Sequence, residues 1–79
     1  MMDRREHFAH CIALFGGTTS ASRRLGIDER AIRRFINGEK PIGHGLFKDT
    51  ALALRALAAD ATEAADLIAS ASSTAPDDL

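Results

Sequence analysis

Four side chains that can donate hydrogen bonds to a polyanion or to base edges recur at helical spacing near the middle of this 79-residue chain. They are Arg30, Arg33, Arg34 and Asn37, at positions i, i+3, i+4 and i+7, which share one face of an α-helix. A guanidinium group is a planar fork of donors that matches a phosphate, or the O6 and N7 atoms of guanine. The large apolar side chains of the same segment project away from that face: Ile32, Phe35 and Ile36.

Capping residues predict where this helix and the one before it begin and end. Asp28 is a strong N-cap, and Asn37-Gly38 is a typical helix end, which gives a helix over residues 29–37. The preceding helix is expected to be capped by the hydroxyl of Thr18 or Thr19 and to end at Gly26. Residues 18–38 therefore read as two short helices joined by a tight turn.

The rest of the chain has helical periodicity and no strand pattern. Apolar residues at i, i+3, i+4 and i+7 predict a helix over residues 3–15: Phe8, Cys11, Ile12 and Phe15. Residues 39–45 form a loop around Pro41, and an alanine-rich helical region starts at Leu46. That region either runs unbroken to about residue 70 or breaks near residues 60–62. We expect an all-α domain of four to five short helices over residues 1–71, and a flexible tail over residues 72–79.

Charge is unevenly distributed along the chain, although the formal net charge is only −1. Residues 18–40 hold six cations against three acids, whereas residues 41–79 hold two cations against six acids. The distribution predicts a basic face near the two short helices and an acidic segment directed away from it.

The apolar composition and the length indicate a small folded domain with a marginal core. The apolar fraction of 46% excludes a disordered chain. A chain this short buries only roughly 60–65% of its unfolded surface, so association with a second copy is expected. The C-terminal region 46–71 is the expected dimer surface, because its large apolar residues exceed what one small chain buries: Leu46, Leu54, Leu57, Leu67 and Ile68.

The single cysteine and the N-terminal residues indicate the cellular compartment of the protein. One cysteine points to a reducing compartment, and charges near the N-terminus argue against an export signal. No stretch has the roughly 20 uncharged apolar residues of a membrane span. We therefore expect a cytoplasmic protein.

Other kinds of site find little support in the sequence. His7 and Cys11 stand one helical turn apart, but no second ligand pair follows at zinc-site spacing. Gly16-Gly17-Thr18-Thr19 lacks the lysine of a phosphate-binding loop, and His44 has no nucleophile or carboxylate in a catalytic arrangement. We expect no metal, no cofactor and no enzymatic activity.

Residues 25–42, LGIDERAIRRFINGEKPI, resemble the helix-turn-helix of the lambda repressor and Cro family, which includes small phage and plasmid regulators; anti-CRISPR-associated repressors are a further possible type. In that family a small-residue turn follows a leucine-glycine pair, as at Leu25-Gly26, and an aliphatic residue stands in mid-recognition helix, as Ile32 does. A bulky apolar residue follows three positions later, matching Phe35. The resemblance spans roughly residues 8–58, and only residues 20–42 carry specific motif content.

The resemblance implies a five-helix DNA-binding domain that acts as a dimer on an inverted repeat. Helix 2 would be residues 18–25 and the recognition helix residues 29–37, with Arg30 closest to the base edges. Two departures concern helix 2: a threonine replaces the usual phosphate-anchoring glutamine, and Ser22 replaces a small alanine, which gives a looser contact or a hydrogen bond to the backbone. Phosphate anchoring would then fall to several residues: Thr18, Thr19, Arg23, Arg24 and Lys40.

Two questions stay open at this point. Glu29 could accept a hydrogen bond from a cytosine amino group or pair with Arg33 at i, i+4, and we favour the pairing. The function expected is that of a sequence-specific regulator of transcription, a dimeric autorepressor binding a palindromic operator in double-stranded DNA, with a protein partner that could relieve repression. The alternative is a protein-interaction module, such as an adaptor, an inhibitor or an antitoxin, that uses the same fold.

Overall fold

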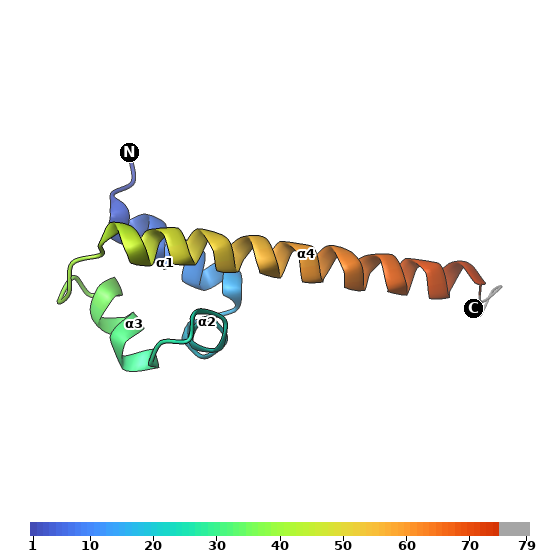
Figure 1. Ribbon diagram of the computed structural model, residues 1–79, viewed down its shortest axis with the longest axis horizontal. Coiled ribbons are helices and arrows are strands. Elements are labelled where there is room, and N and C mark those ends of the chain that lie inside the picture. Colours follow the sequence, from blue (N-terminus) through green and yellow to red (C-terminus); the bar gives the residue numbers. More distant parts are fainter. Residues whose placement is uncertain (75–79) are drawn as a thin grey trace.

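Four helices follow one another in the computed structural model, which describes the backbone of residues 1–74 and the side chains of residues 1–72. They are α1 (Arg4–Phe15), α2 (Thr18–Leu25), α3 (Glu29–Ile36) and α4 (His44–Thr74). No strand occurs in the described residues, which confirms the all-α class. α1 packs against each of the other three helices, and α2 and α3 lie side by side next to it (Figure 1).

The cap of α3 is the predicted Asp28, whereas the cap of α1, Asp3, was not predicted. Asp3 and Glu6 form a reciprocal capping box, in which the Glu6 N–H donates to Asp3 Oδ1 at 2.9 Å and the Asp3 N–H donates to Glu6 Oε1 at 3.0 Å. Asp28 accepts a hydrogen bond from the Arg30 N–H at 3.3 Å at the start of α3. Both helices therefore begin at carboxylates that accept hydrogen bonds from otherwise unpaired backbone N–H groups.

The predicted threonine cap of α2 is wrong. The N-cap is Gly17, with φ 112° and ψ −178°, and no side chain makes a capping hydrogen bond there. Because glycine tolerates this conformation, the chain enters α2 one residue earlier and Thr18 becomes its first helical residue. The hydroxyl of Thr19 is directed to another helix instead, as described below.

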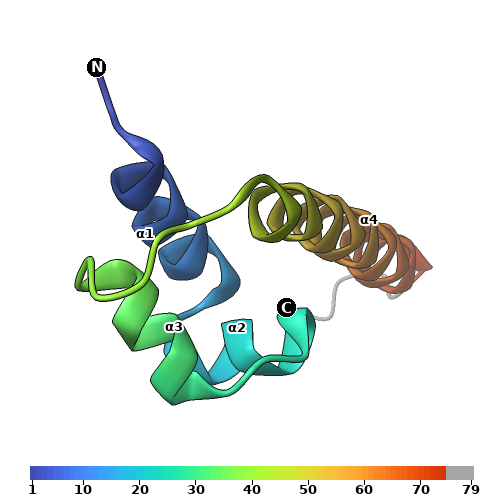
Figure 2. The ribbon, with the colours of Figure 1, turned by 60° about the vertical axis from the view of Figure 1, so that its left-hand side comes forward.

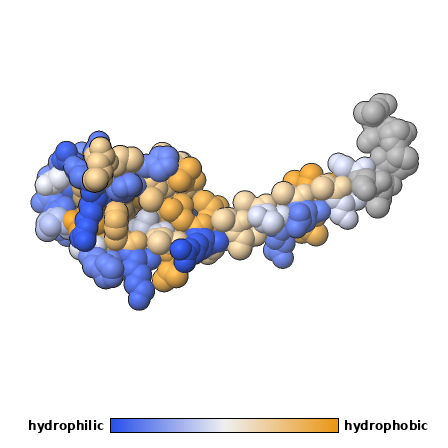
Figure 3. Space-filling model, turned by 90° about the horizontal axis from the view of Figure 1, so that it is seen from above, coloured by the Kyte–Doolittle hydropathy of each residue, from blue (hydrophilic) through white to orange (hydrophobic). Residues whose placement is uncertain are grey.

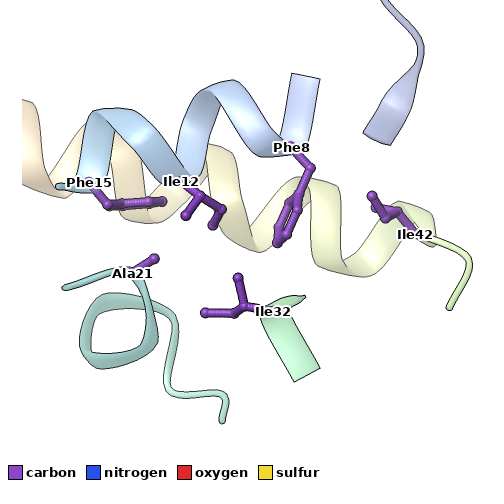
Figure 4. Packing of buried hydrophobic residues seen from close by; sticks show 6 residues of the cluster. All are labelled: Phe8, Ile12, Phe15, Ala21, Ile32 and Ile42. Carbon is purple, nitrogen blue, oxygen red and sulfur yellow. The ribbon is translucent and has the colours of Figure 1, made fainter. Parts of the chain in front are cut away.

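The core lies where α1 crosses the two short helices. Its buried members come from α1, α2, α3 and the loop that follows α3 (Figure 4): Phe8, Ile12, Phe15, Ala21, Ile32 and Ile42. Phe8 and Ile32 are fully buried, and the Phe8 ring meets the Phe35 ring edge to face with centroids 5.8 Å apart. Burial of each large side chain stabilises the fold by about 1.5–3 kcal/mol, so this cluster fixes the inward face of α3.

α4 is one unbroken helix of 31 residues, which decides between the two possibilities left open by the sequence. It begins at His44, two residues before the expected Leu46, and it passes through residues 60–62 without a break. Between Gly45 and Pro76 the sequence has no glycine or proline and is rich in alanine, so nothing there interrupts the helix. The single long helix also explains why the described residues hold four helices rather than the five implied by the family resemblance.

The C-terminal half of α4 extends beyond the rest of the molecule. Leu57 is the last half-buried residue of α4 among the described side chains, and residues 58–72 are all classed as exposed. We call residues 58–74 the arm, and it gives the molecule a long axis of 54 Å against 24 and 21 Å (Figures 1 and 3). The expected tail boundary at residue 72 is wrong, because residues 72–74 are helical; the remaining tail positions lie outside the described residues.

Among the described helices, none is long and apolar enough to cross a membrane.

Candidate nucleic-acid interface

A short turn sets α2 and α3 against each other. Gly26 ends α2, and the Ser22 hydroxyl donates a 2.6 Å hydrogen bond to the carbonyl oxygen of Ile27. This bond closes the turn between the helices, so Ser22 provides the backbone contact that was one of its two expected roles. Figure 2 shows α2 and α3 side by side, with the loop after α3 returning past α1 to α4.

The four polar residues predicted from the spacing form the outward face of α3 and its C-cap, since α3 ends at Ile36, one residue before the expected end, and Asn37 is the C-cap. All four are exposed in the structure: Arg30, Arg33, Arg34 and Asn37. On the opposite side Ile32 is fully buried, and Phe35 and Ile36 pack against the core. In the described part of the chain no hydrogen bond or ion pair engages the side chains of Arg30 and Arg34. α3 is thus held from one side and presents unpaired guanidinium groups on the other.

Glu29 is the first residue of α3, and its carboxylate contacts both α2 and α3. Arg33 Nη2 lies 3.3 Å from Glu29 Oε1, and the Thr19 hydroxyl donates to the same oxygen at 3.2 Å. The pairing of Glu29 with Arg33 that we favoured is therefore present. The contact from Thr19 could not be predicted, because it joins residues on two different helices.

Those two contacts change what Thr19 and Arg33 offer to a ligand. The Thr19 hydroxyl donates its only hydrogen to Glu29, so it cannot donate to a phosphate at the same time. The Arg33 side chain is 58% exposed and has four further N–H groups, so the ion pair leaves most of its donors available.

The remaining candidate phosphate anchors do not form one cluster. Thr18 is half-buried in the first turn of α2, and Arg23 is exposed in the last turn, with no hydrogen-bond or ion-pair partner among the described residues. Arg24 is paired with a carboxylate of the arm, Asp60, at 2.9 Å. The Lys40 ammonium lies 5.7 Å from the centroid of the Phe35 ring, in the loop after α3.

Two arginines of α1 that the sequence did not single out belong to the same side of the molecule as Lys40. Arg4 donates a 2.9 Å hydrogen bond to the carbonyl oxygen of Ile42, and its guanidinium lies 5.6 Å from the centroid of the Phe47 ring. Arg5 lines the same surface hollow as Lys40, beside Gly38. No sequence signal indicates this grouping, since it depends on how the start of α1 packs against a loop more than thirty residues away.

The five expected dimer residues divide into two groups. Leu46, Leu54 and Leu57 are partly buried against the chain's own core, so their burial does not require a second copy. Leu67 and Ile68 lie on the arm and are 67% and 68% exposed. The expectation that all five exceed the capacity of the core is therefore wrong for the first three.

A second hollow, of about 280 Å³, lies between α1 and α4. His7, Cys11, Phe47 and Leu54 are among its lining residues, and the rings of His7 and Phe47 meet at 71° with centroids 6.3 Å apart. Partial burial raises the pKa of the Cys11 thiol above its ordinary value, which lowers the fraction of reactive thiolate. Among the described residues no group of three or more His, Cys, Asp or Glu side chains is placed to hold a metal ion.

No family model, curated protein or solved structure matches this chain. The geometry of the site itself is therefore the basis for assigning a function.

Proposed function

We propose that this protein is a sequence-specific regulator that binds double-stranded DNA by placing α3 in the major groove. The observation that carries the proposal is the division of α3 between its two faces. Ile32 is fully buried on one side, while Arg30 and Arg34 are exposed and unpaired in the described part of the chain on the other. The major groove admits one α-helix, and guanidinium groups at its floor distinguish guanine from other bases.

Within this proposal the residues of α3 have distinct roles. Arg30, in the first turn, reads a base edge directly, because first-turn side chains reach furthest in this docking geometry. Arg33, Arg34 and Asn37 extend the contact along the groove. Glu29 acts mainly by orienting Arg33 and by joining α3 to Thr19.

The phosphate contacts come from both ends of α2 and from the loop after α3. Arg23 and Lys40 are exposed and have no carboxylate partner among the described residues, so they are available without rearrangement. Arg24 and Thr19 join them only after leaving Asp60 and Glu29. Phosphate contacts of this kind position the protein on the duplex without reading sequence.

A second copy is proposed to pair with the arm. The side of α4 that faces the core, with Thr50, Leu54 and Leu57, continues at alternating steps of three and four residues through positions 61 and 64 to Ile68, as in a coiled-coil seam. Past Leu57 that seam has no partner within the described side chains, and Figure 3 shows apolar groups along the arm. Leu67 and Ile68 would gain cover from the same part of another chain.

Pairing of two arms suits recognition of an inverted repeat. An arm of 17 helical residues is about 25 Å long, which is of the same order as the roughly 34 Å between half-sites one turn apart. The arm carries Asp60, Glu63 and Asp66, and these carboxylates are best kept away from phosphates. A dimer of this design, similar to the lambda repressor and Cro family, would act in the cytoplasm as an autorepressor controlled by its own concentration or by a protein partner.

Selection of bound sequences from a random duplex pool, followed by a salt titration, tests the proposal. A palindromic consensus is expected, and affinity should fall about a hundredfold or more between low and moderate salt. If no duplex binds at about 50 mM salt, the proposal is wrong.

The second candidate is a protein-interaction module, and the observation that favours it is the exposed apolar pair Leu67 and Ile68 on an acidic arm. In that case the arm would engage another protein rather than a second copy. The chain would then remain monomeric at high concentration and show no salt-dependent affinity for DNA.

A further inference from the structure

A surface hollow of about 280 Å³ lies at the end of α3 furthest from α2, between the start of α1 and the loop after α3. Three cationic residues line it: Arg4, Arg5 and Lys40. The hollow lies directly after the proposed base-reading helix, because Gly38, which follows the C-cap Asn37, is also part of its lining.

Two of the three cations are available to a ligand. Arg4 is committed to the Ile42 carbonyl oxygen and the Phe47 ring. Arg5 and Lys40 are exposed and have no hydrogen-bond or ion-pair partner among the described residues. The Lys40 ammonium lies 5.7 Å from the centroid of the Phe35 ring, a contact that leaves its N–H groups without an acceptor. The one carboxylate in the lining is Asp3, and its Oδ1 already accepts the Glu6 N–H at 2.9 Å. The lining therefore carries a net charge of +2, from three cations and one carboxylate.

Gly38 allows the Arg5 side chain to lie across the backbone at this point. An ideal Cβ on residue 38 would stand 2.5 Å from Arg5 Nη1, so any larger residue would displace the guanidinium. Gly38 also has φ 80°, which a residue with a side chain adopts only with strain. The backbone N–H groups of Gly38, Glu39 and Lys40 donate to carbonyl oxygens at the end of α3, so these three backbone donors are not available to a ligand.

We propose that this hollow binds a phosphate group through Arg5 and Lys40. A guanidinium donates two parallel hydrogen bonds to phosphate oxygens, and an ammonium adds a compact charge beside it. The phosphate belongs either to a DNA backbone that flanks the bases under α3 or to free inorganic phosphate. The DNA form of this inference rests on the proposed function, whereas the free-phosphate form does not.

The first experiment uses inorganic phosphate and the isolated protein. Phosphate is titrated against chloride at constant ionic strength, and the backbone amide resonances of Gly38 and Glu39 are followed by NMR. Saturable shifts of these resonances are expected with phosphate and not with chloride. Arg5→Gln and Lys40→Gln should each weaken the apparent affinity at least several-fold. Arg55→Gln on α4 is the matched control and should leave it unchanged.

The second experiment measures duplex affinity as a function of salt concentration for the same variants. A lost phosphate contact reduces the log–log slope by about 0.9, so Arg5→Gln should reduce it by that amount and Arg55→Gln should not. If the substitutions weaken only duplex binding, the DNA backbone is the source of the phosphate. If they weaken only the binding of inorganic phosphate, the source is free phosphate.

If wild type shows no saturable shift and the slope is equal for both arginine variants, the phosphate site is refuted. Absence of any duplex binding by wild type refutes the proposed function, but the result of the inorganic phosphate titration still stands. Arg5→Lys separates charge from geometry, because lysine keeps the charge and cannot donate the paired bonds; full retention of affinity in that variant would refute the guanidinium's role. Circular dichroism of each variant should match wild type, since neither the Arg5 nor the Lys40 side chain makes a hydrogen bond within the described chain.

Discussion

Arg24 Nη1 lies 2.9 Å from Asp60 Oδ2, and this ion pair joins the last turn of α2 to the arm. The two side chains are 33% and 64% exposed, so solvent screens the pair and its contribution to stability is small. Its position has a functional consequence under the proposed function. The Asp60 carboxylate is paired with the Arg24 guanidinium, which would otherwise be available to a DNA phosphate.

Asp60→Asn should therefore raise duplex affinity while leaving the fold nearly unchanged. Removal of an exposed ion pair costs at most about 1 kcal/mol of folding free energy. Release of Arg24 should raise affinity about two- to fivefold at low salt, which corresponds to a similar free energy. Glu63→Gln removes the same charge from the arm without a partner on α2, and equal gains from both variants would show that only overall charge matters.

Glu29→Gln separates the two roles open to that residue. Glutamine keeps an acceptor for Thr19 but loses the ion pair with Arg33. If Glu29 contacts no base and only neutralises part of the charge of Arg33, affinity should rise for all duplexes without a change in base preference, because a negative charge near the phosphates is removed. Selection from a random pool checks this, with Glu39→Gln in the nearby loop as a control for charge. A changed preference at one base pair would mean that Glu29 itself reads a base.

Arg30→Ala and Lys40→Ala should affect DNA binding in different ways. Loss of a direct base contact relaxes discrimination at one position and costs roughly 1–3 kcal/mol there. Loss of a phosphate contact weakens all sequences alike and reduces the salt slope by about one. Binding isotherms for the consensus and for single-base variants distinguish these results. The opposite pattern would reverse the two assignments.

Ile32→Ala should destabilise the whole domain, because Ile32 is fully buried where α3 meets α1. Truncation of a large core side chain to alanine costs about 2–5 kcal/mol, which is a large share of the 5–15 kcal/mol that holds typical domains folded. Urea unfolding followed by circular dichroism measures the loss. Leu52→Ala, at a residue 55% exposed on α4, is the control and should change stability by no more than about 0.5 kcal/mol.

A double substitution on the arm, Leu67→Ser with Ile68→Ser, should convert a dimer into a monomer without unfolding the compact part. Both side chains are about two-thirds exposed and lie beyond the last core contact at Leu57. Sedimentation equilibrium reports the mass, and affinity should fall more for a palindrome than for a single half-site. Leu14→Ser, at a residue 56% exposed on α1, is the matched control. A wild-type chain that is monomeric at high concentration would contradict the proposed pairing.

The sequence by itself determined the three N-terminal helices and the two faces of α3. Those features depend on signals a few residues apart: the carboxylate cap Asp28, the helix ends near glycine, and the apolar period that buries Ile32. The same local reasoning was wrong about the start of α2, where the conformation of Gly17 replaced a threonine cap. It could not choose between one or two helices at the C-terminus, because alanine-rich sequence is compatible with both.

Only the tertiary structure decided which charged groups are free. The partners of Thr19, Arg24 and Arg4 are ten, 36 and 38 residues away along the chain, and no spacing rule reaches that far. Packing likewise assigned Leu46, Leu54 and Leu57 to the core and left Leu67 and Ile68 on the arm. Helix propensity and amphipathic pattern act along the chain, whereas ion pairs and buried area depend on how the helices pack. The spacing therefore predicted an arginine face, and the fold decided which of its neighbours are already engaged.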